Sequence, residues 1–216
     1  MKDSTKIKLG KFPKANFIWS ATNLFYKNSF LSKSGWFKSI WRGSAVDKNG
    51  LPIPWVVYTC TYFLEPRLNK QMTVFEWGSG NSTLWWARHT NSVIAAEHDQ
   101  TWFKKISKII PANATIRKVS LQGTEYEEAI LSEKSNFDII VIDGRKRIKC
   151  AMTAIQKLKT DGVIMWDNSE RDCYDEGINF LQKNGFKKID FFGPLPITHK
   201  TDQTTIFYKT KNILGI

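Results

Sequence analysis

The chain has 216 residues, of which 42% are hydrophobic and 24% charged. This length suits one domain, and this composition excludes a disordered or collagen-like chain. The longest apolar run, residues 55–64, is about half of what a membrane-spanning helix needs. The first residues lack the apolar stretch of a secretory signal, and the three cysteines are widely and irregularly spaced. We therefore expect a cytoplasmic protein without a disulfide or zinc framework.

The net charge of +12 is unevenly distributed. Residues 1–70 carry twelve lysines and arginines against three acids, whereas residues 71–216 carry 20 against 17. The basic segment is also rich in aromatic residues. This mixture suits an anionic partner, which is an acidic or phosphorylated substrate, an anionic membrane surface or nucleic acid. A solvated basic flank whose aromatic side chains pack on the main domain is an equally open interpretation.

Residues 1–70 predict a helical N-terminal extension. Apolar residues recur at sevens at positions 17, 24 and 31, which predicts one amphipathic helix. Residues 43–54 are rich in turn formers, and Pro54 can open a further helix that reaches about Glu65. We expect this extension to cap a separate domain over residues 71–216.

From residue 71 onward, short β-branched runs alternate with helical patterns, which is typical of a parallel sheet wrapped by helices. The predicted strands are 72–76, 92–97, 114–120, 137–143, 162–167, 186–192 and 204–208. The predicted helices lie near 81–90, 99–109, 123–132, 147–160 and 171–184. No helix fits between the last two strands, so these strands should pair antiparallel. The sequence thus predicts an α/β fold with a mostly parallel sheet and an antiparallel last strand.

A glycine turn follows the first predicted strand. Glu76 ends this strand, and Gly78 and Gly80 allow a tight turn and close approach of a ligand to the backbone. The next strand ends in Glu97, nineteen residues after Gly78, where an acid can bind both hydroxyls of a ribose. Thr83 stands where a dinucleotide site needs its third glycine, and Glu76 would repel a pyrophosphate while suiting an ammonium group. The pattern therefore favours S-adenosylmethionine over a nicotinamide dinucleotide.

The stretches 76–83, 96–99, 137–144 and 162–168 resemble the class I S-adenosylmethionine-dependent methyltransferases, particularly bacterial members of unassigned substrate. The resemblance spans about residues 55–210 and implies a seven-stranded, Rossmann-like sheet. Ser82 departs from it, because many members have a third glycine there. The cofactor-binding residues that the resemblance and the glycine turn imply are Glu76, Gly78, Ser79, Gly80, Asn81, Ser82, Thr83, Glu97, His98 and Asp143, with Trp102 beside the adenine.

Two aspartates end neighbouring strands of the predicted sheet. Asp143 and the pair Asp167-Asn168 are separated by one strand–helix–strand unit, so they should meet at the edge where open α/β folds bind ligands. Two carboxylates and an amide oxygen can hold Mg²⁺, which activates a bound hydroxyl. The arrangement is similar to that of catechol and caffeoyl-coenzyme A O-methyltransferases, which implies Asp143, Asp167 and Asn168 as metal ligands and Lys146 as a base. The arginines flanking Lys146 disfavour a nearby cation, so a metal-free site with Asp143 as the base stays open.

The expected activity is O-methylation of a hydroxyl on a small-molecule or glycan acceptor, which can be anionic or neutral, with no DNA partner. The expected substrate-facing residues are Trp36, Trp41, Arg42, Trp55, Tyr58, Arg145 and Arg147. Aromatic faces stack on sugars or rings, and arginines bind carboxylates or phosphates. Three alternatives stay open: a tRNA or rRNA methyltransferase, a non-catalytic nucleoside-binding protein, and a protein held peripherally at an anionic membrane by its extension.

Overall fold

The computed structural model describes residues 13–216, and residues 13–16 by their backbone only. One seven-stranded sheet forms the body, with strand order β3-β2-β1-β4-β5-β7-β6. Five strands are parallel, while β7 runs antiparallel to both β5 and β6. This confirms the predicted α/β, Rossmann-like sheet with an antiparallel end. The strands are β1 (Thr73–Trp77), β2 (Ser92–Glu97), β3 (Ala114–Lys118), β4 (Phe137–Ile142), β5 (Leu158–Asp167), β6 (Lys187–Pro194) and β7 (Thr201–Tyr208).

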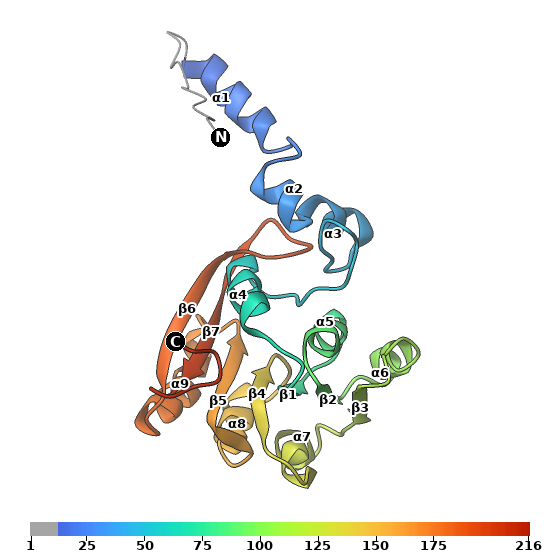
Figure 1. Ribbon diagram of the computed structural model, residues 1–216, viewed down its shortest axis with the longest axis vertical. Coiled ribbons are helices and arrows are strands. Elements are labelled where there is room, and N and C mark those ends of the chain that lie inside the picture. The colour runs from blue at the N-terminus through green and yellow to red at the C-terminus, as the bar shows by residue number, and fades with distance from the viewer. Residues whose placement is uncertain (1–12) are drawn as a thin grey trace.

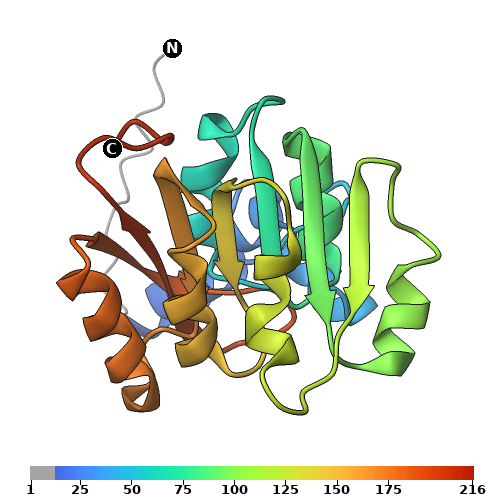
Figure 2. The same ribbon diagram turned by 90° about the horizontal axis from the view of Figure 1, so that it is seen from below.

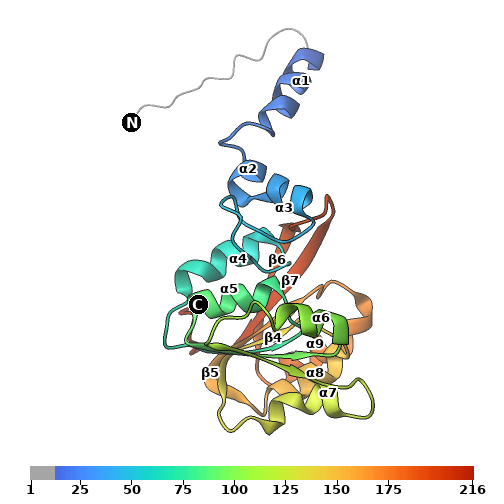
Figure 3. The same ribbon diagram turned by 90° about the vertical axis from the view of Figure 1, so that its right-hand side faces the viewer.

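Helices cover both faces of the sheet, as Figure 3 shows most plainly. α4 and α5 pack on one face and α7, α8 and α9 on the other, while α6 packs beside β2 and β3. Seen from below in Figure 2, the parallel strands lie side by side between these layers. The helices of the body are α4 (Tyr58–Leu64), α5 (Asn81–His89), α6 (Gln100–Ile106), α7 (Glu125–Glu128), α8 (Arg147–Ala154) and α9 (Asp175–Lys183).

The sheet has a separate apolar core on each face, because successive side chains of a strand point to opposite faces. Val74 of β1 packs beneath α4 and α5, whereas its neighbours Phe75 and Trp77 pack against the opposite layer. Every residue of β4 is buried, which explains why this strand reads as an unbroken apolar run. The central strands are therefore rigidly held, and their carboxyl ends are fixed relative to one another.

The bounds of several elements differ from the prediction, and the difference is largest where α8 is followed by β5. The helix expected over 147–160 ends at Ala154, and β5 begins at Leu158, four residues before the expected 162. The side chain of Leu158 crowds Gly162, where a Cβ would lie 2.7 Å from a Leu158 methyl carbon. A side chain at position 162 would clash with Leu158, so glycine allows the two residues to pack closely within β5.

The single amphipathic helix expected before residue 43 is wrong. Within residues 13–42 the structure has three shorter helices, α1 (Pro13–Asn23), α2 (Phe30–Ser34) and α3 (Trp36–Arg42) (Figure 1). The side chain of Asn23 donates to the carbonyl of Trp19 (2.7 Å) where α1 ends, and the hydroxyl of Ser29 caps α2 by accepting from the amide of Ser32 (3.1 Å). These local hydrogen bonds interrupt the helix that the apolar spacing suggested.

The core begins before the boundary expected at residue 70. Val57, Tyr58 and Cys60, at the start of α4, are no more than 1% exposed and belong to the same apolar cluster as Val74 of β1. α1 and α2, in contrast, lie away from the sheet in Figures 1 and 3. The part of the extension that stands outside the body is thus shorter than 70 residues.

Candidate functional site

A cavity of about 690 Å³ opens at the carboxyl ends of β1, β2 and β4. We call it the first cavity. Its lining combines the glycine turn after β1, the acid that ends β2, the start of α6 and the loop after β4. The lining residues are Trp55, Gly78, Ser79, Ser82, Glu97, His98, Asp99, Thr101, Trp102, Asp143, Gly144, Arg145 and Arg147. The structure therefore brings most of the expected cofactor-binding residues to one place.

Gly78 makes the turn after β1 possible. Its backbone has φ +104°, a conformation that residues with a side chain rarely adopt, and its amide donates to the carbonyl of Ala96 (2.9 Å). A Cβ at this position would lie 2.9 Å from the backbone carbonyl oxygen of Asp143. Only glycine allows β1 and the loop after β4 to approach this closely, and this approach joins the two sides of the cavity.

Glu97 is held in one orientation at the wall of the first cavity. Its residue is 4% exposed, and its two carboxylate oxygens accept from the Ser79 hydroxyl (2.7 Å) and the Asp99 amide (2.7 Å). His98 lies with Nδ1 3.2 Å from the same carboxylate. The Trp102 ring lies over the turn and donates through Nε1 to the carbonyl of Ser79 (2.6 Å). Burial and two donors together preorganise this acid for further hydrogen bonds.

Glu76 lies beneath the glycine turn and is completely buried. Its Oε2 accepts from the hydroxyl of Thr83 (2.6 Å), which itself accepts from the amide of Gly80 (3.0 Å). The Oε1 atom of Glu76 has no partner among the described residues. Burial raises the pKa of Glu76 from 4.5 to about 7, against the opposing effect of the neighbouring Ser82 and Thr83 hydroxyls. A buried carboxylate oxygen without a donor beside a ligand cavity favours a ligand that brings a positive charge.

Four of the residues expected on the cofactor do not line the cavity: Glu76, Gly80, Asn81 and Thr83. Asn81 donates its side-chain amide to the Ser44 hydroxyl (2.9 Å) and to the Ala45 carbonyl (2.6 Å), which ties the start of α5 to the loop after α3. Thr83 is fully buried and directed at Glu76. Ser82, the departure from the family pattern, does line the cavity.

A second cavity of about 440 Å³ adjoins the first. Both are lined by Trp55, Asp143 and Arg147, so these three residues stand at the junction. The remaining lining comes from the end of β5 and the hairpin between β6 and β7, and consists of Asp167, Asn168, Arg171, Leu195, Thr198, Lys200, Thr201 and Asp202. A ligand in the first cavity and another in the second would therefore meet at Asp143.

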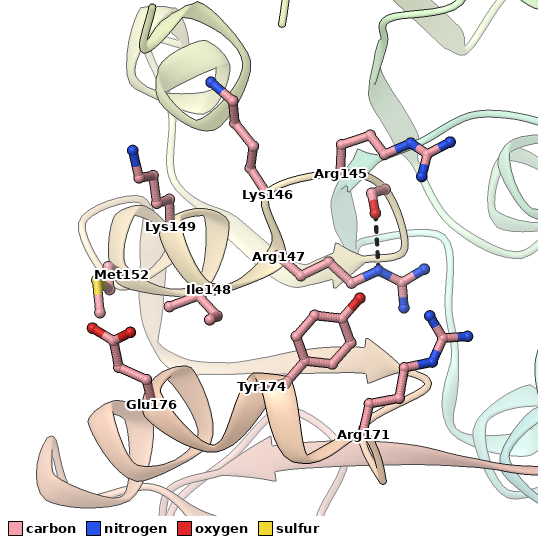
Figure 4. A pocket seen from close by; sticks show the side chains of 10 residues that line it. Arg145, Lys146, Arg147, Ile148, Lys149, Met152, Arg171, Tyr174 and Glu176 are labelled. Atoms are coloured by element: carbon pink, nitrogen blue, oxygen red, sulfur yellow. Dashed lines mark hydrogen bonds between the residues drawn. The ribbon is translucent and has the colours of Figure 1, made fainter.

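The three expected metal ligands do come together, but around the guanidinium group of Arg147. This group donates to Asp143 Oδ1 (3.0 Å), to Asn168 Oδ1 (3.0 Å) and to the backbone carbonyl of Asp167. Its Nε donates to the carbonyl of Gly144 (2.9 Å), and the side chain is only 9% exposed (Figure 4). The donor groups that Mg²⁺ would need are thus already bound to a fixed cation.

The residues at this site accordingly do not fit a divalent metal, and the expectation of Asp143, Asp167 and Asn168 as ligands is corrected. Asp167 is turned toward Thr204, whose hydroxyl donates to its Oδ1 (2.7 Å). Asn168 donates its amide to Asp202 (2.6 Å). No cluster of three or more His, Cys, Asp or Glu residues suited to a metal occurs among residues 13–216.

The pKa values of Asp143 and Asp167 are both raised, mainly because the two carboxyl groups are buried close together. Burial raises the pKa of Asp143 from 3.8 to about 7, although Arg147 opposes this rise. Burial, and after it the charge of Asp143, raises the pKa of Asp167 well above its usual range. An acid whose pKa lies near neutrality can accept a proton at physiological pH and pass it on. Of the two, Asp143 faces both cavities.

Lys146, expected as a base, does not reach the junction of the cavities. Its backbone has φ +49°, and its amine donates to the carbonyl of Gly123 (2.6 Å) and to Glu127 (2.8 Å) on α7. Figure 4 shows the side chain directed away from Arg147. An amine bound to a carboxylate on the far side of its loop does not suit a base that must reach an acceptor beside Asp143.

The expected substrate-facing residues divide into two groups. Trp55, Arg145 and Arg147 line the first cavity. The other four, all from the extension or from α4, line neither cavity among the described residues: Trp36, Trp41, Arg42 and Tyr58. Trp41 is 91% exposed, while Tyr58 is 1% exposed within the core, where burial raises its pKa to about 12. Among the described residues before 71, Trp55 alone lines the two cavities.

A third cavity of about 570 Å³, the basic cavity, lies on the other side of Arg147, between α8 and α9. Figure 4 shows the guanidinium groups of Arg145, Arg147 and Arg171 at one end, with the Tyr174 ring between them and an apolar floor of Ile148 and Met152. Arg171 also lines the second cavity. The arginines thus form a continuous positive border from the basic cavity to the junction.

Arg171, Asp202 and Thr204 are site residues that the sequence interpretation missed. Antiparallel pairing of β7 with β5 places Thr204 opposite Asp167. The predicted antiparallel strand already implied part of this arrangement. A strand that runs antiparallel beside 162–167 begins at the carboxyl end of that strand, where Asp167 lies. The register that selects Thr204 depends on packing that the sequence pattern does not show.

No protein-family model and no curated protein matches the sequence. Solved structures do. A candidate O-methyltransferase from Klebsiella pneumoniae is 15% identical, with a TM-score of 0.56 over 89% of this chain and 96% of that one. An rRNA methylase from Streptococcus thermophilus is 17% identical, with a TM-score of 0.52 over 69% and 93%. A spermidine synthase from Thermotoga maritima is 18% identical, with a TM-score of 0.51 over 70% and 56%.

These likenesses show the fold that class I methyltransferases share, and they confirm the expected resemblance at that level. The same fold occurs in a spermidine synthase, so the fold does not by itself decide which group is transferred. The chemistry has to be argued from the cavities.

Proposed function

We propose that the protein is an S-adenosylmethionine-dependent methyltransferase that acts on the oxygen of a small-molecule or glycan hydroxyl. The observation that supports this most is the set of acids around the glycine turn. Glu97, Asp99 and Asp143 line the first cavity, and Glu76 lies beneath it with a free oxygen. A pyrophosphate would be repelled by these charges, whereas a ligand that combines a ribose, an ammonium group and a sulfonium is complementary to them.

The residues of the first cavity fit this cofactor. Glu97 is oriented to accept from the ribose hydroxyls, and the free oxygen of Glu76 suits the ammonium group. His98 and Trp102 offer flat surfaces for an adenine. The bound cofactor would supply an electrophilic methyl group, and the protein supplies the positions of the two reactants.

Asp143 is the proposed base. It stands where the two cavities join, its Oδ1 is held by Arg147, and its pKa near 7 matches the task of accepting a proton from a hydroxyl. Arg147 keeps the carboxylate in one orientation and partly offsets its charge. Trp55, at the same junction, offers a ring face to the acceptor.

The acceptor is proposed to carry an anionic group. Three arginines border the route from the junction to the basic cavity, and the side chain of Arg145 has no carboxylate partner among the described residues. Arginine binds carboxylates and phosphates in a bidentate manner. An acceptor with a phosphate or carboxylate at one end and a hydroxyl at the other would place the hydroxyl beside Asp143.

Calorimetry tests the cofactor part of the proposal. Wild-type protein should bind S-adenosylmethionine or its demethylated product in the micromolar range and NAD poorly. Glu97→Ala removes a charged acceptor, which should weaken binding by about 1.5–3 kcal/mol, or roughly 10- to 150-fold. Glu125→Ala, an exposed acid on α7 outside the cavities, is the control and should leave the affinity unchanged. Tight binding of NAD with none of the sulfonium cofactor would contradict the assignment.

The acceptor part is tested by following transfer of a labelled methyl group to a panel of phosphorylated and acidic sugars and phenols, with bulk rRNA included. Label on a hydroxyl of an anionic small molecule supports the proposal. Label on rRNA alone would assign the acceptor to nucleic acid, and no transfer to any acceptor by a protein that binds the cofactor would favour a non-catalytic role.

A further inference from the structure

The start of the described chain exposes a concentration of apolar side chains. Six of them, which we call the α1 patch, lie on α1 and in the turn that follows it, with exposed fractions from 52% to 74%. They are Phe17, Ile18, Trp19, Leu24, Phe25 and Tyr26. Soluble proteins rarely expose so many large apolar side chains within ten residues of the chain unless the segment binds something.

The α1 patch is separate from the proposed active site. In Figures 1 and 3, α1 extends outward from the body, beyond α2 and α3. No residue of 13–54 lines the first or the second cavity. The patch therefore offers a surface for a partner other than the cofactor or the acceptor's reacting group.

The charge around the patch specifies the kind of partner. Residues 4–46 contain eight lysines and arginines and no acid. Lys27 and Lys33 are exposed directly beside the patch, in the turn after α1 and on α2. A second copy of this chain would bring like charges together, which disfavours self-association through this surface. The partner must accept apolar side chains and must itself be negative.

We propose that α1 and α2 bind the surface of an anionic lipid bilayer. Aromatic rings and aliphatic side chains such as Ile18 and Leu24 enter the boundary between headgroups and acyl chains, while lysines remain at the level of the anionic headgroups. RNA would use the aromatic rings for stacking but offers nothing to Ile18 and Leu24. Between residues 13 and 216, no helix is long and apolar enough to span a bilayer.

Aromatic contacts connect the patch to the body. Phe25 stacks on Phe37 with ring centroids 5.2 Å apart, and Phe37 meets Trp36 edge-on, again at 5.2 Å. Trp36 donates through Nε1 to the carbonyl of Thr198 (2.7 Å), which borders the second cavity. A bilayer bound at the patch is therefore linked by direct contacts to the rim of the acceptor's cavity, which suits an acceptor that resides at a membrane.

Sedimentation with vesicles tests the proposal without any measurement of activity. The full chain should sediment with vesicles that contain roughly 30% phosphatidylglycerol in phosphatidylcholine, and should remain in solution with phosphatidylcholine alone. Screening should release much of it at about 0.5 M salt. Phe17→Ser with Trp19→Ser should reduce the affinity at least tenfold, whereas Ile109→Ser with Phe192→Ser, which removes comparably exposed side chains elsewhere, should not.

Charge reversal provides the second arm. Lys27→Glu with Lys33→Glu should lower the affinity for anionic vesicles at least about tenfold. Lys104→Glu with Lys108→Glu, on and just after α6, changes the net charge equally and should have an effect of less than about threefold. Equal effects of the two pairs, or equal binding to neutral vesicles, would overturn the proposal.

The other partners give distinct results. If the patch joins two copies, the wild type is a dimer without lipid, Phe17→Ser with Trp19→Ser makes it a monomer, and vesicles do not bind. If the partner is RNA, wild-type protein retards labelled RNA in a gel and does not bind anionic vesicles, and the lysine reversal abolishes the RNA binding. Either pattern would replace the membrane assignment.

Discussion

Replacing Glu76 with glutamine should stabilise the protein by an amount that depends on pH. The carboxyl group is completely buried, and burial raises its pKa from 4.5 to about 7. At about 1.4 kcal/mol for each tenfold change in the acid constant, this rise corresponds to about 3 kcal/mol of unfavourable free energy for the ionised form in the fold. Glutamine has the same shape and keeps an acceptor for the Thr83 hydroxyl, but it has no charge.

The sign follows from proton binding. Between pH 4.5 and about 7 the folded state keeps a proton on Glu76 that the unfolded state has released, so this group lowers stability as the pH rises through that window. The penalty is absent below pH 4.5 and complete above about 7. The variant should therefore gain up to about 3 kcal/mol over wild type at pH 8, and this gain should disappear at about pH 4.

Urea unfolding of wild type and Glu76→Gln at a series of pH values measures this difference directly. An unpaired amide in the variant would shift all values by a constant, so the change with pH is the decisive quantity. Glu125→Gln, at an exposed position, should show no such change. A difference between wild type and Glu76→Gln that is the same at pH 4 and pH 8 would refute the reasoning that the buried carboxyl holds a proton.

The remaining predictions concern the junction of the cavities. Asp143→Asn should reduce methyl transfer at saturating cofactor by about 10²- to 10⁴-fold, the usual contribution of a base. For wild type, kcat/KM should rise with pH and level off above about 7, because Asp143 must be ionised; a flat profile would exclude it as the base. Excess chelator should leave turnover unchanged, and Arg147→Met should move the midpoint of the pH profile upward, because the neighbouring positive charge is lost. Inhibition by chelator, reversed by Mg²⁺, would restore the metal interpretation.

The fold could be predicted because its local signals agree. The apolar run of β4 and the turn at Gly78 each admit one interpretation, and the absence of a helix between the last two strands requires an antiparallel pair. The extension could not be predicted in the same way. Apolar spacing indicates a helix only when a body is present to bury its apolar face, and Phe17 and Leu24 remain exposed.

The candidate site could be predicted as far as strand ends determine it. Glu97 ends β2 and Asp143 directly follows β4, so topology alone brings them together. For residues that do not adjoin a strand, the position of the side chain depends on loop conformation and packing, which the spacing of residues in the sequence does not reveal. The positive φ of Lys146 places its amine on α7, and packing against Phe30 places Tyr58 inside the core.

Arg147 links the predicted metal ligands to a different chemistry. It lies four residues after Asp143, at the start of α8, and its guanidinium group donates to both Asp143 and Asn168. A guanidinium group satisfies the oxygens that would otherwise bind Mg²⁺, but it has one charge and no open coordination position, so it cannot activate a bound hydroxyl as a metal does. In the proposed reaction, the proton of the acceptor hydroxyl must then go to a protein group. Asp143 can receive it only because burial outweighs the pull of Arg147 and keeps its pKa near 7. The fixed cation and the raised pKa are therefore two parts of one arrangement: Arg147 holds Asp143 in one orientation and limits the rise of its pKa, while burial keeps that pKa near 7.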